Sequence, residues 1–532
     1  MPGTRWLRRS PSSNRYGVAW RVQAAAADKG VARMARRAVA LFVLLAALYS
    51  LSAGLRASRG AAITGDEPFY LLTTQSLLED GDLDLRQQYR RHSYRAFFDH
   101  PDGLWMQSVP TADGRILSPH NPGLPVLLIP GFALGGLRGA QLQLQLLAAL
   151  TFALVYVWVA RVTGEARWSA WATLALALAA TPFVYATEIY PEVPAALVLV
   201  AALLLLEAGG PAAGDAARAA DGSCHLPFVA APRDPGGSPS RRREVARARV
   251  LALLLAALLW LGIKYAPLAG VVAAATFLRA GREGRWALAG AGVLLAVPYV
   301  LFHLRVFGAL TPYSVNVVYA GDSTPEVLRA HVTDLANRFY RLWGLFVDRR
   351  FGLARWAPVL LLALPGMVLM ARRKGAPRLA LGLIAAQHLM AVFVAITMMG
   401  WWFPGRTVMT VLPLYALPLA LVLQRGGRGA RSAFFLLAGL SVAVTAALVR
   451  AVNLRQVTVA VDPFAMPVGW FQAMGLLFPD YRSWAGSTPW LTGLWLAVLL
   501  ALGSWGWRLD GMDWRGRLDR RDRLAGGQAL LK

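Results

Sequence analysis

Long apolar runs alternate with short polar segments along almost the whole chain of 532 residues. Hydrophobic residues make up 56% of the sequence and charged residues only 16%, which excludes a string of soluble domains with polar surfaces. Most runs approach the roughly 20 residues that an α-helix needs to cross about 30 Å of hydrocarbon. The pattern therefore predicts an all-α polytopic membrane protein with about twelve transmembrane helices. The expected spans are 38–55, 141–160, 170–186, 192–208, 248–263, 265–279, 285–305, 356–371, 379–397, 406–424, 432–450 and 488–507.

One further apolar stretch, from Gly123 to Leu137, tests this topology. Its apolar part is short and is interrupted by Pro125 and Pro130. If the stretch crossed the membrane, the basic loops at 161–169 and 209–247 would both move to the outer face, against the usual distribution of cations. We therefore expect a juxtamembrane or re-entrant helix on the outer side.

The net charge of +26 follows the predicted topology. With the N-terminus inside, the inner segments carry 35 of the 55 lysines and arginines but only 12 of the 29 acids. This positive-inside distribution predicts a multi-pass protein of the inner (plasma) membrane with both termini in the cytoplasm. Topology explains the basicity better than nucleic-acid binding does. Contact between the basic tails and anionic lipid headgroups is compatible with it.

The chain is expected to have five parts. They are a basic cytoplasmic tail (1–37), a transmembrane module (38–310) whose first outer loop is 56–140, a cytoplasmic linker within it (209–247), further helices and outer loops (311–507), and a second basic tail (508–532). The linker is rich in Ala, Gly, Pro and Arg, which predicts disorder. It contains Cys224, the only cysteine, so an intramolecular disulfide is excluded.

The first outer loop holds nine of the seventeen acids expected on the outer side. Asp66 and Glu67 come soon after the first span and directly precede Pro68. An acid at the cap, a second acid in the first turn and a proline near N1 are typical of a helix start. Such a helix would continue through Leu71–Asp80 and end at Gly81, as a C′ glycine would.

A paired acid at the membrane rim also suits a general base that acts on a hydroxyl acceptor beside a lipid-linked donor. In this hypothesis Asp66 takes the acceptor proton, while Glu67 orients the acceptor or helps to bind a divalent cation. The capping and catalytic interpretations do not exclude each other, because a capping carboxylate is held rigidly.

Three more short elements fall on the predicted outer side. The first is Pro119-His120-Asn121-Pro122-Gly123-Leu124-Pro125, near the end of the first outer loop. The second is Glu192-Val193-Pro194 at the outer start of a later span, with Glu188 one turn away. The third is Lys264-Tyr265-Ala266-Pro267, between two spans.

With Asp66-Glu67, these elements resemble the GT-C superfamily of polyprenyl-phosphate-sugar-dependent glycosyltransferases. The nearest branches are the lipid A aminoarabinose transferases and the protein O-mannosyltransferases. Those enzymes have an acid motif early in the first outer loop, a Lys/His-Pro-Pro element near its end, an acid-x-Pro element and a Lys-Gly-Pro element. In this chain the double proline is missing and the spacing after Lys264 differs. The resemblance covers roughly residues 38–310.

The resemblance implies a GT-C-like bundle with juxtamembrane helices in a large first outer loop. It also assigns binding roles: the donor phosphate to Lys264, Arg138 and Arg406, and the sugar or acceptor to Glu188, Glu192, His120 and Tyr70. Plainer interpretations stay open, since Lys264 suits a side chain that snorkels to the interface and Glu188 and Glu192 suit a capped helix. The chain has only four lysines among its 55 basic residues, so a lysine between two apolar spans is unusual.

These observations predict an inverting glycosyltransferase that moves a sugar from a polyprenyl-phosphate donor to a glycan, lipid or protein hydroxyl on the extracytoplasmic face. One alternative is a secondary transporter or lipid-linked sugar flippase, in which polar residues near the midplane and inverted repeats are typical. Another is a non-catalytic membrane scaffold with the same fold, in which Asp66 and Lys264 need not converge. No Walker or GxGxxG signature is found.

Overall fold

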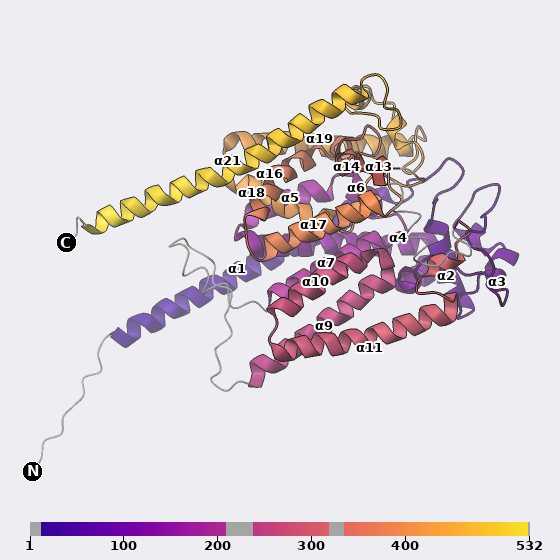
Figure 1. The fold of residues 1–532 in the computed structure, drawn as a ribbon, viewed down its shortest axis with the longest axis horizontal. Coiled ribbons are helices and arrows are strands. Elements are labelled where there is room, and N and C mark those ends of the chain that lie inside the picture. The colour runs from indigo at the N-terminus through magenta and orange to yellow at the C-terminus, as the bar shows by residue number, and fades with distance from the viewer. Residues whose placement is uncertain (1–11, 209–237, 319–334, 399, 530–532) are drawn as a thin grey trace, which may run out of the picture.

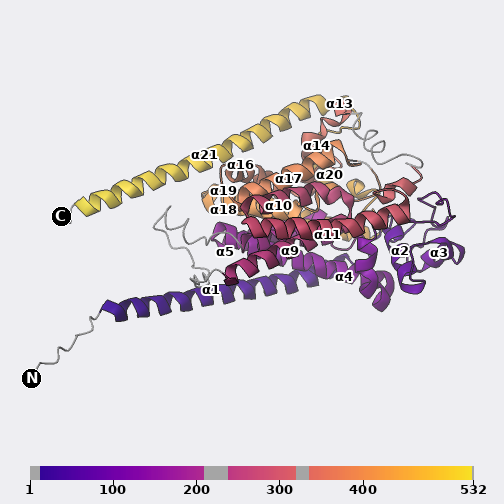
Figure 2. The same cartoon turned by 60° about the horizontal axis from the view of Figure 1, so that its bottom comes forward.

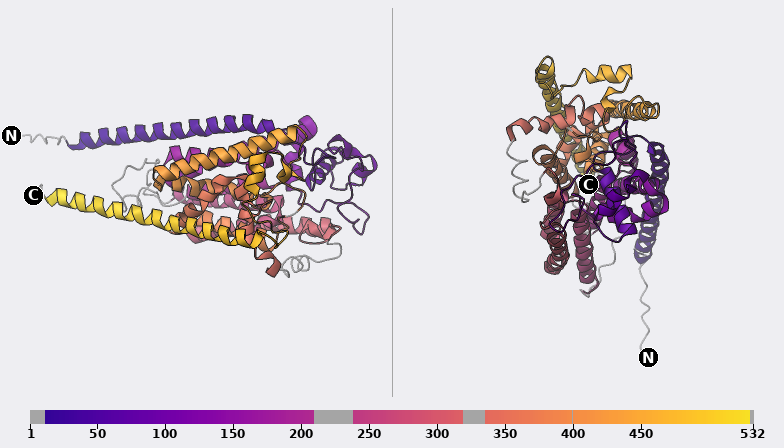
Figure 3. Two further views of the ribbon diagram at one scale, coloured as in Figure 1. Left: turned by 90° about the horizontal axis from the view of Figure 1, so that it is seen from above. Right: turned by 90° about the vertical axis from the view of Figure 1, so that its right-hand side faces the viewer.

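The computed structural model describes residues 12–208, 238–318, 335–398 and 400–529, which form a long bundle of helices joined by loops. Figure 1 shows both termini at one end of the bundle and the helices α2 and α3 at the other. Figure 2 shows that α1 and α21 extend past the bundle at the end that holds the termini. In the right-hand view of Figure 3 the opposite end, with the first long loop, faces the reader.

The α-helices have the following bounds: α1 Ser12–Tyr49, α2 Glu67–Glu79, α3 Arg86–Arg90, α4 Gly123–Thr163, α5 Ala166–Ala177, α6 Ala180–Tyr185, α7 Glu192–Glu207, α9 Ser238–Leu261, α10 Ala266–Arg279, α11 Arg282–Phe307, α13 Leu335–Arg338, α14 Arg341–Val347, α15 Leu353–Trp356, α16 Ala363–Ala371, α17 Ala376–Phe393, α18 Ala416–Arg425, α19 Arg428–Asn453, α20 Gly469–Gly475 and α21 Thr488–Ala529. Short 3₁₀ turns include η1 Ser50–Ser52, η3 Ile263–Tyr265, η5 Pro358–Leu362, η6 Arg406–Val408 and η7 Leu412–Tyr415.

A helix lies within each of the twelve predicted spans, and the protein is an all-α polytopic membrane protein. Six described segments are long and apolar enough to cross a membrane: Gly30–Ser52, Gly123–Thr163, Arg282–Val315, Ala376–Phe393, Arg428–Asn453 and Thr488–Gly511. Pro358–Ala371 and Leu412–Arg425 are shorter apolar helices. The count of twelve crossings stays a prediction.

Three predicted boundaries differ from the structure. Helix α9 begins at Ser238, inside the linker predicted at 209–247, and residues 209–237 with Cys224 lie outside the described part. Helices α1 and α21 continue into the predicted tails, so that residues 12–37 and 508–529 are helical. In each case an apolar span carries its helix into the polar flank, because adding a residue to an existing helix is easier than starting one.

Helices α7 and α18 lie inside the bundle. Helix α7 packs between α4 and α9, and α18 packs against α5 and α16. Both are apolar on nearly all sides, as expected of helices surrounded by protein. By contrast, α11, α19 and α21 expose large apolar side chains such as Leu301, Leu436 and Leu500. This exposed apolar surface suits contact with lipid.

The stretch from Gly123 to Leu137 forms a hairpin with the helix that follows it. The helical backbone is interrupted at Gly135 and Gly136, where the chain reverses between a first leg (123–134) and a second leg (137–163) of α4. The Gln143 side chain joins the legs, donating to the carbonyl of Leu127 (2.6 Å) and accepting from the amide of Gly131 (3.0 Å). At about 1.5 Å per residue the first leg is too short to cross a membrane.

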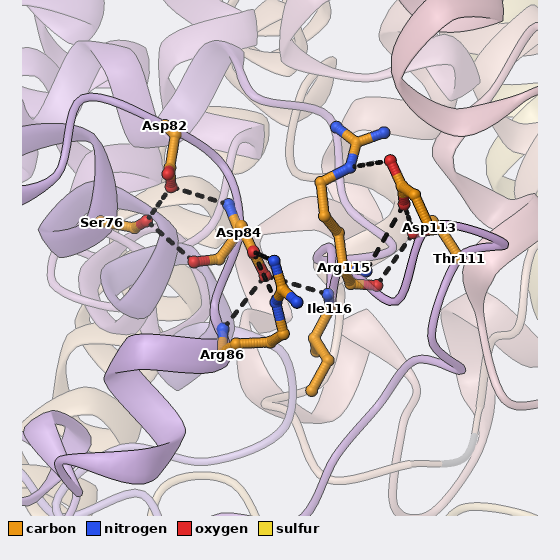
Figure 4. Close-up of polar contacts among 8 residues, drawn as sticks. All are labelled: Ser76, Asp82, Asp84, Arg86, Thr111, Asp113, Arg115 and Ile116. Carbon is orange, nitrogen blue, oxygen red and sulfur yellow. Dashed lines mark hydrogen bonds and ion pairs between the residues drawn. The ribbon is translucent and has the colours of Figure 1, made fainter.

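The loop between α2 and α4 is folded back by its acids (Figure 4). Asp84 accepts hydrogen bonds from the Ile116 amide (3.1 Å) and the Arg86 side chain (2.7 Å). The Leu85 amide donates to the carbonyl of Ile116 (2.8 Å), and a tight turn follows Thr111. These bonds hold the segment around Ile116 against the stretch that follows α2.

The crossing of the two legs of α4 predicts a strict need for glycine. A Cβ added at Gly139 would overlap the carbonyl oxygen of Gly131, a backbone atom that cannot move without separating the legs. We expect Gly139→Ala to destabilise the protein by about 1–3 kcal/mol, seen as a lower thermal midpoint in detergent. Gly290→Ala on α11 is the control, because nothing lies within 4 Å of the added atom. Equal midpoints for the two variants would contradict this packing.

Candidate functional site

Four segments that are far apart in the sequence bring charged side chains together at the end of the bundle opposite the termini. Asp66 directly precedes α2, and Glu192 is the first residue of α7. Lys264 lies in η3, between α9 and α10, and Arg406 begins η6. Each charge thus lies at a helix end, where the chain leaves the apolar bundle and a polar side chain can be accommodated.

These four side chains form a continuous chain of alternating charge, called here the ion-pair chain. Arg406 Nη2 donates to Asp66 Oδ2 at 2.7 Å, and Arg406 Nε donates to Glu192 Oε1 at 3.2 Å. Lys264 Nζ donates to the same oxygen of Glu192 at 2.7 Å. Two acids and two bases cancel formally, which is how buried charges are tolerated.

Burial is graded along the ion-pair chain. The side chains of Glu192 and Arg406 are 2% and 9% exposed, whereas those of Asp66 and Lys264 are 20% and 29% exposed. The central pair is therefore sequestered, and the two ends remain within reach of a ligand. This arrangement leaves one carboxylate and one ammonium group available at the same site.

Asp66 is held from its other side by Gln107 and His120. Gln107 Nε2 donates to Asp66 Oδ1 at 3.3 Å, and its Oε1 lies 2.8 Å from His120 Nε2. The amide can accept only at its oxygen, so this orientation places the imidazole proton on Nε2. Burial, with help from the nearby cations Arg406 and Lys264, lowers the pKa of His120 to about 4, so the ring is neutral at pH 7.

The charge on Asp66 is fixed by its partners. Burial alone would raise the pKa of Asp66, but the guanidinium of Arg406 outweighs it and the pKa lies well below its ordinary value. Asp66 is therefore a stable carboxylate. Asp66 occupies the predicted N-cap position of α2, but its side chain makes no capping hydrogen bond.

Aromatic rings frame the site. The Arg406 guanidinium lies 3.9 Å from the ring centre of Tyr190 and 4.9 Å from that of Trp402, so cation–π contacts hold it in place. The ring of Tyr70 lies 4.7 Å from that of His120. Tyr190, between the two predicted acids Glu188 and Glu192, thus orients the central cation.

Glu67 faces a different environment from Asp66. Its Oε2 accepts from the Thr64 amide (2.8 Å) and its Oε1 from the Ile189 amide (2.9 Å), which ties the start of α2 to the segment before α7. Burial raises the pKa of Glu67 to about 7 despite these hydrogen bonds. Glu67, not Asp66, therefore provides the polar support at this helix start.

Glu188 lies beside Glu67 and not in the ion-pair chain. Its side chain is buried, and both carboxyl oxygens lack a hydrogen-bond partner in the described part of the protein. A cavity of about 10 Å³ adjoins it, with Glu67, Gln141 and Thr187 among the lining residues. Burial raises the pKa of Glu188 well above its ordinary value, and the neighbouring charge of Glu67 adds to this.

Arg138 does not join the ion-pair chain. It donates to Gln141 at 3.4 Å and lies against Gly54, where an added Cβ would come within 2.9 Å of its Nη2. The sequence could not distinguish Arg138 from Arg406, because both are cations at the outer ends of predicted spans. Only the folded chain shows that Arg406 reaches the acids.

The predicted divalent cation does not fit the acids in the arrangement seen. Asp66 and Glu67 point to different partners, and Asp66 already contacts a guanidinium that would repel a metal ion. Among the described residues no group of three or more His, Cys, Asp or Glu side chains is placed to hold a metal.

A large apolar groove is lined by residues that lie close in sequence to two members of the ion-pair chain. It has a volume of about 590 Å³ and is lined only by apolar residues from α2, α4, α7, α9 and α11 and their flanks, among them Pro194, Trp260 and Leu261. Pro194 follows Glu192 by two residues, and Leu261 precedes Lys264 by three. The groove and the Lys264–Glu192 pair therefore share the same two helix ends.

Six residues predicted from the sequence are thus brought together: Asp66, Tyr70, His120, Glu192, Lys264 and Arg406. Gln107 and Tyr190 were not predicted as site residues. No pattern marks Gln107, a single amide in an irregular loop, and its position depends on the folding of residues 104–122. Tyr190 carried a usable signal, since it lies between two candidate acids.

Comparison with models of known families and with curated proteins found no match. Among solved structures, the chain is similar to ArnT from Cupriavidus metallidurans in the apo state, with 16% identity, coverage of 82% of this chain and 68% of that one, and a TM-score of 0.47. ArnT bound to undecaprenyl phosphate gives 17% identity, 89% and 72% coverage, and a TM-score of 0.45. The apo oligosaccharyltransferase of Archaeoglobus fulgidus gives 12% identity, coverage of 82% of this chain and 56% of that one, and a TM-score of 0.36. These neighbours are GT-C enzymes, the group that the sequence resembles, but likeness at this level assigns no activity.

The unpartnered carboxyl of Glu188 predicts a pH-dependent stability. A carboxyl whose pKa is raised by folding stabilises the fold at low pH and loses that contribution as pH rises through its folded pKa. Glu188→Gln removes this group, so its thermal midpoint should fall less than that of the wild type between pH 5 and pH 8. Each pKa unit corresponds to about 1.4 kcal/mol. Glu79→Gln, an exposed change on α2, is the control. A wild-type pH dependence in Glu188→Gln would contradict the assignment.

Proposed function

We propose that this protein is an inverting glycosyltransferase that moves a sugar from a polyprenyl-phosphate donor to a hydroxyl acceptor on the extracytoplasmic face of the inner membrane. One observation carries the proposal: a partly buried chain of two acids and two bases starts from the same helix ends, at Glu192 and Lys264, that line an apolar groove through Pro194 and Leu261. A ligand that fits both has an anionic headgroup joined to a long apolar tail. The motifs that resemble the GT-C superfamily, residues 66–67 and 264–267 among them, support the same class.

In this proposal the donor binds in two parts. Its isoprenoid chain occupies the groove next to Pro194 and Leu261, where burial of apolar surface supplies the affinity. Its phosphate lies against Lys264, the more exposed cation, with Arg406 behind it. A fixed cation in a partly desolvated site stabilises the phosphate most when the sugar leaves and its charge increases.

The chemistry is a single displacement. Asp66 takes the proton of the acceptor hydroxyl, and the hydroxyl oxygen attacks the anomeric carbon from the side opposite the phosphate. The bond between that carbon and the phosphate oxygen breaks, and the electron pair stays on the phosphate, which Lys264 and Arg406 hold. One displacement inverts the anomeric centre. Glu192 keeps both cations in place, because its Oε1 contacts both Lys264 and Arg406.

The remaining predicted residues have supporting roles in this proposal. His120 and Gln107 position Asp66, and Tyr70 stacks near His120 where it can face the sugar or the acceptor. Glu67 joins the segments before α2 and α7 through its two hydrogen bonds, and neither Glu67 nor its neighbour Glu188 contacts the donor. Glycan, lipid and protein acceptors are all compatible with this site.

The orientation follows from charge and from shape. The positive-inside distribution places both termini in the cytoplasm, and both termini lie at the end of the bundle opposite α2, which Asp66 directly precedes (Figure 1). The proposed site then faces outward. The proposed site draws on both halves of the chain. Arg406 comes from the part after residue 310 and pairs with Asp66, which lies in the module expected at 38–310.

Replacement of Asp66 tests the proposed base. Asp66→Asn keeps the shape and the contact with Gln107 but cannot accept a proton. We expect the variant to fold in membranes and to lose transfer by about 10²-fold or more. Mass spectrometry of envelope glycans and glycoproteins, in cells with the wild type, the variant or no protein, measures the outcome. Asp113→Asn, a change at an exposed acid of the same loop, is the matched control. Full transfer in Asp66→Asn would eliminate the mechanism.

Lys264 should act mainly on the donor. Lys264→Met removes the cation and leaves Glu192 with Arg406 alone, so we expect the KM for the donor to rise by roughly 10- to 100-fold, the range of a lost charge-assisted hydrogen bond. Initial-rate kinetics with a polyprenyl-phosphate sugar measures this change. Lys374→Met, at an exposed lysine between α16 and α17, is the control. A donor KM unchanged in Lys264→Met would rule out a phosphate contact.

A further inference from the structure

The partners of Asp66 make the proposed base a poor proton acceptor. Asp66 Oδ2 is bonded to Arg406 Nη2 at 2.7 Å, and Oδ1 accepts from Gln107. A carboxylate that is ion-paired with a guanidinium accepts a proton poorly, because protonation would break the pair. The arrangement that makes Asp66 stable as an anion therefore makes it a weak base.

The same guanidinium is part of the proposed phosphate site. Arg406 uses Nη2 for Asp66 and Nε for Glu192, and its ring contacts with Tyr190 and Trp402 fix the plane of the fork. A phosphate that approaches from the Lys264 end brings a further negative charge to a group of four charges that formally cancels. Phosphate and Asp66 then compete for Arg406, while Glu192 is the more deeply buried acid and the better retained partner.

We propose that the donor phosphate displaces Asp66 from Arg406, so that the base is released only when the donor is in place. The proposal rests on the proposed function of the same site. Gln107 is the positioning residue, because its bond to Oδ1 keeps the carboxylate in place after Oδ2 is freed. Oδ2 then takes the acceptor proton as the new carbon–oxygen bond forms and the phosphate leaves with the electron pair. The acceptor is activated after donor binding, and binding is ordered.

The charged and titratable groups around Asp66 come from every element packed on it. They are Arg406 and His120 at short range, and Glu67, Tyr70, Tyr190, Glu192 and Lys264 farther away. Arg406 is the dominant one, since it alone among the described residues forms an ion pair with Asp66 at hydrogen-bond distance. Loss of that partner to a phosphate therefore raises the pKa of Asp66, and burial of the carboxylate acts in the same direction.

Two pH profiles test this release. The pH dependence of kcat/KM for the donor reports the free enzyme, and that of kcat reports the enzyme with donor bound. The donor is a phosphodiester and does not titrate between pH 4 and pH 8. We expect kcat to fall at acid pH, with a midpoint near or above the ordinary Asp pKa of about 3.9. We expect no such fall in kcat/KM over the same pH range. Coincident limbs would overturn the proposal.

A binding measurement separates this proposal from the proposed function. The probe is an isoprenyl methyl phosphodiester, which has the anionic headgroup and the apolar chain but no sugar to transfer. In this proposal probe binding raises the pKa of Asp66, so binding is coupled to uptake of a proton. The affinity of the wild type for the probe should therefore increase as the pH is lowered, by at most about tenfold for each unit by which binding raises that pKa. Asp66→Asn should bind tightly without this pH dependence.

Equal pH dependence in the wild type and in Asp66→Asn would overturn the release of the base. A second outcome is that probe binding depends on pH in the wild type but not in Asp66→Asn, while no sugar transfer is detected. That outcome would support the exchange of partners at Arg406 and would remove the glycosyltransferase proposal. Gln107→Leu gives an independent readout, because loss of positioning should lower kcat and leave the pH dependence of binding intact. An unchanged kcat in Gln107→Leu would remove its positioning role.

Discussion

Burial of charge at one end of an apolar bundle is the constraint on which the site depends. Arg406 and Glu192 are almost completely withdrawn from solvent, and an unpaired charge there would cost several kcal/mol. The structure satisfies both by alternating acid and base through Asp66, Arg406, Glu192 and Lys264. Because these residues come from four separate segments, the ion-pair chain also fixes how α2, α7, η3 and η6 meet.

This constraint links the fold to the proposed chemistry. The segments that deliver the charges are helix ends, and the helices behind them supply the apolar walls of the groove. An amphiphilic donor then matches the protein in two ways, with a phosphate for the cations and an isoprenoid chain for the walls. The same pairing that stabilises the buried charges restrains Asp66, so stability and the proposed activity are coupled through one guanidinium.

Much of the fold could be predicted because apolar length and charge bias are local signals. The long runs predict the helices, and Gly81 marks the end of α2, where it adopts a φ of +73°. The first leg of α4 was predicted not to span, because Pro125 and Pro130 limit its apolar length, and it is short. Helix ends were less well predicted, as the start of α9 inside the expected linker shows.

The site was predicted only in part, because side-chain partners depend on tertiary structure. Asp66, Glu192 and Lys264 lie in short motifs that could be recognised. Arg406 and Arg138 looked equivalent in sequence, and only Arg406 reaches the acids. The acid pair also concealed a division of roles, because Glu67 accepts from the amides of Thr64 and Ile189 whereas Asp66 pairs with Arg406.

The most direct test of this account is to map where the donor headgroup binds. A polyprenyl phosphate with a photoreactive group on the first isoprene unit would be cross-linked to the full-length protein in lipid vesicles, and the labelled peptides identified by mass spectrometry. The account predicts labels in 192–198 and 257–264, which excess unmodified polyprenyl phosphate prevents. Labels confined to other outer segments, or insensitive to that competitor, would contradict it.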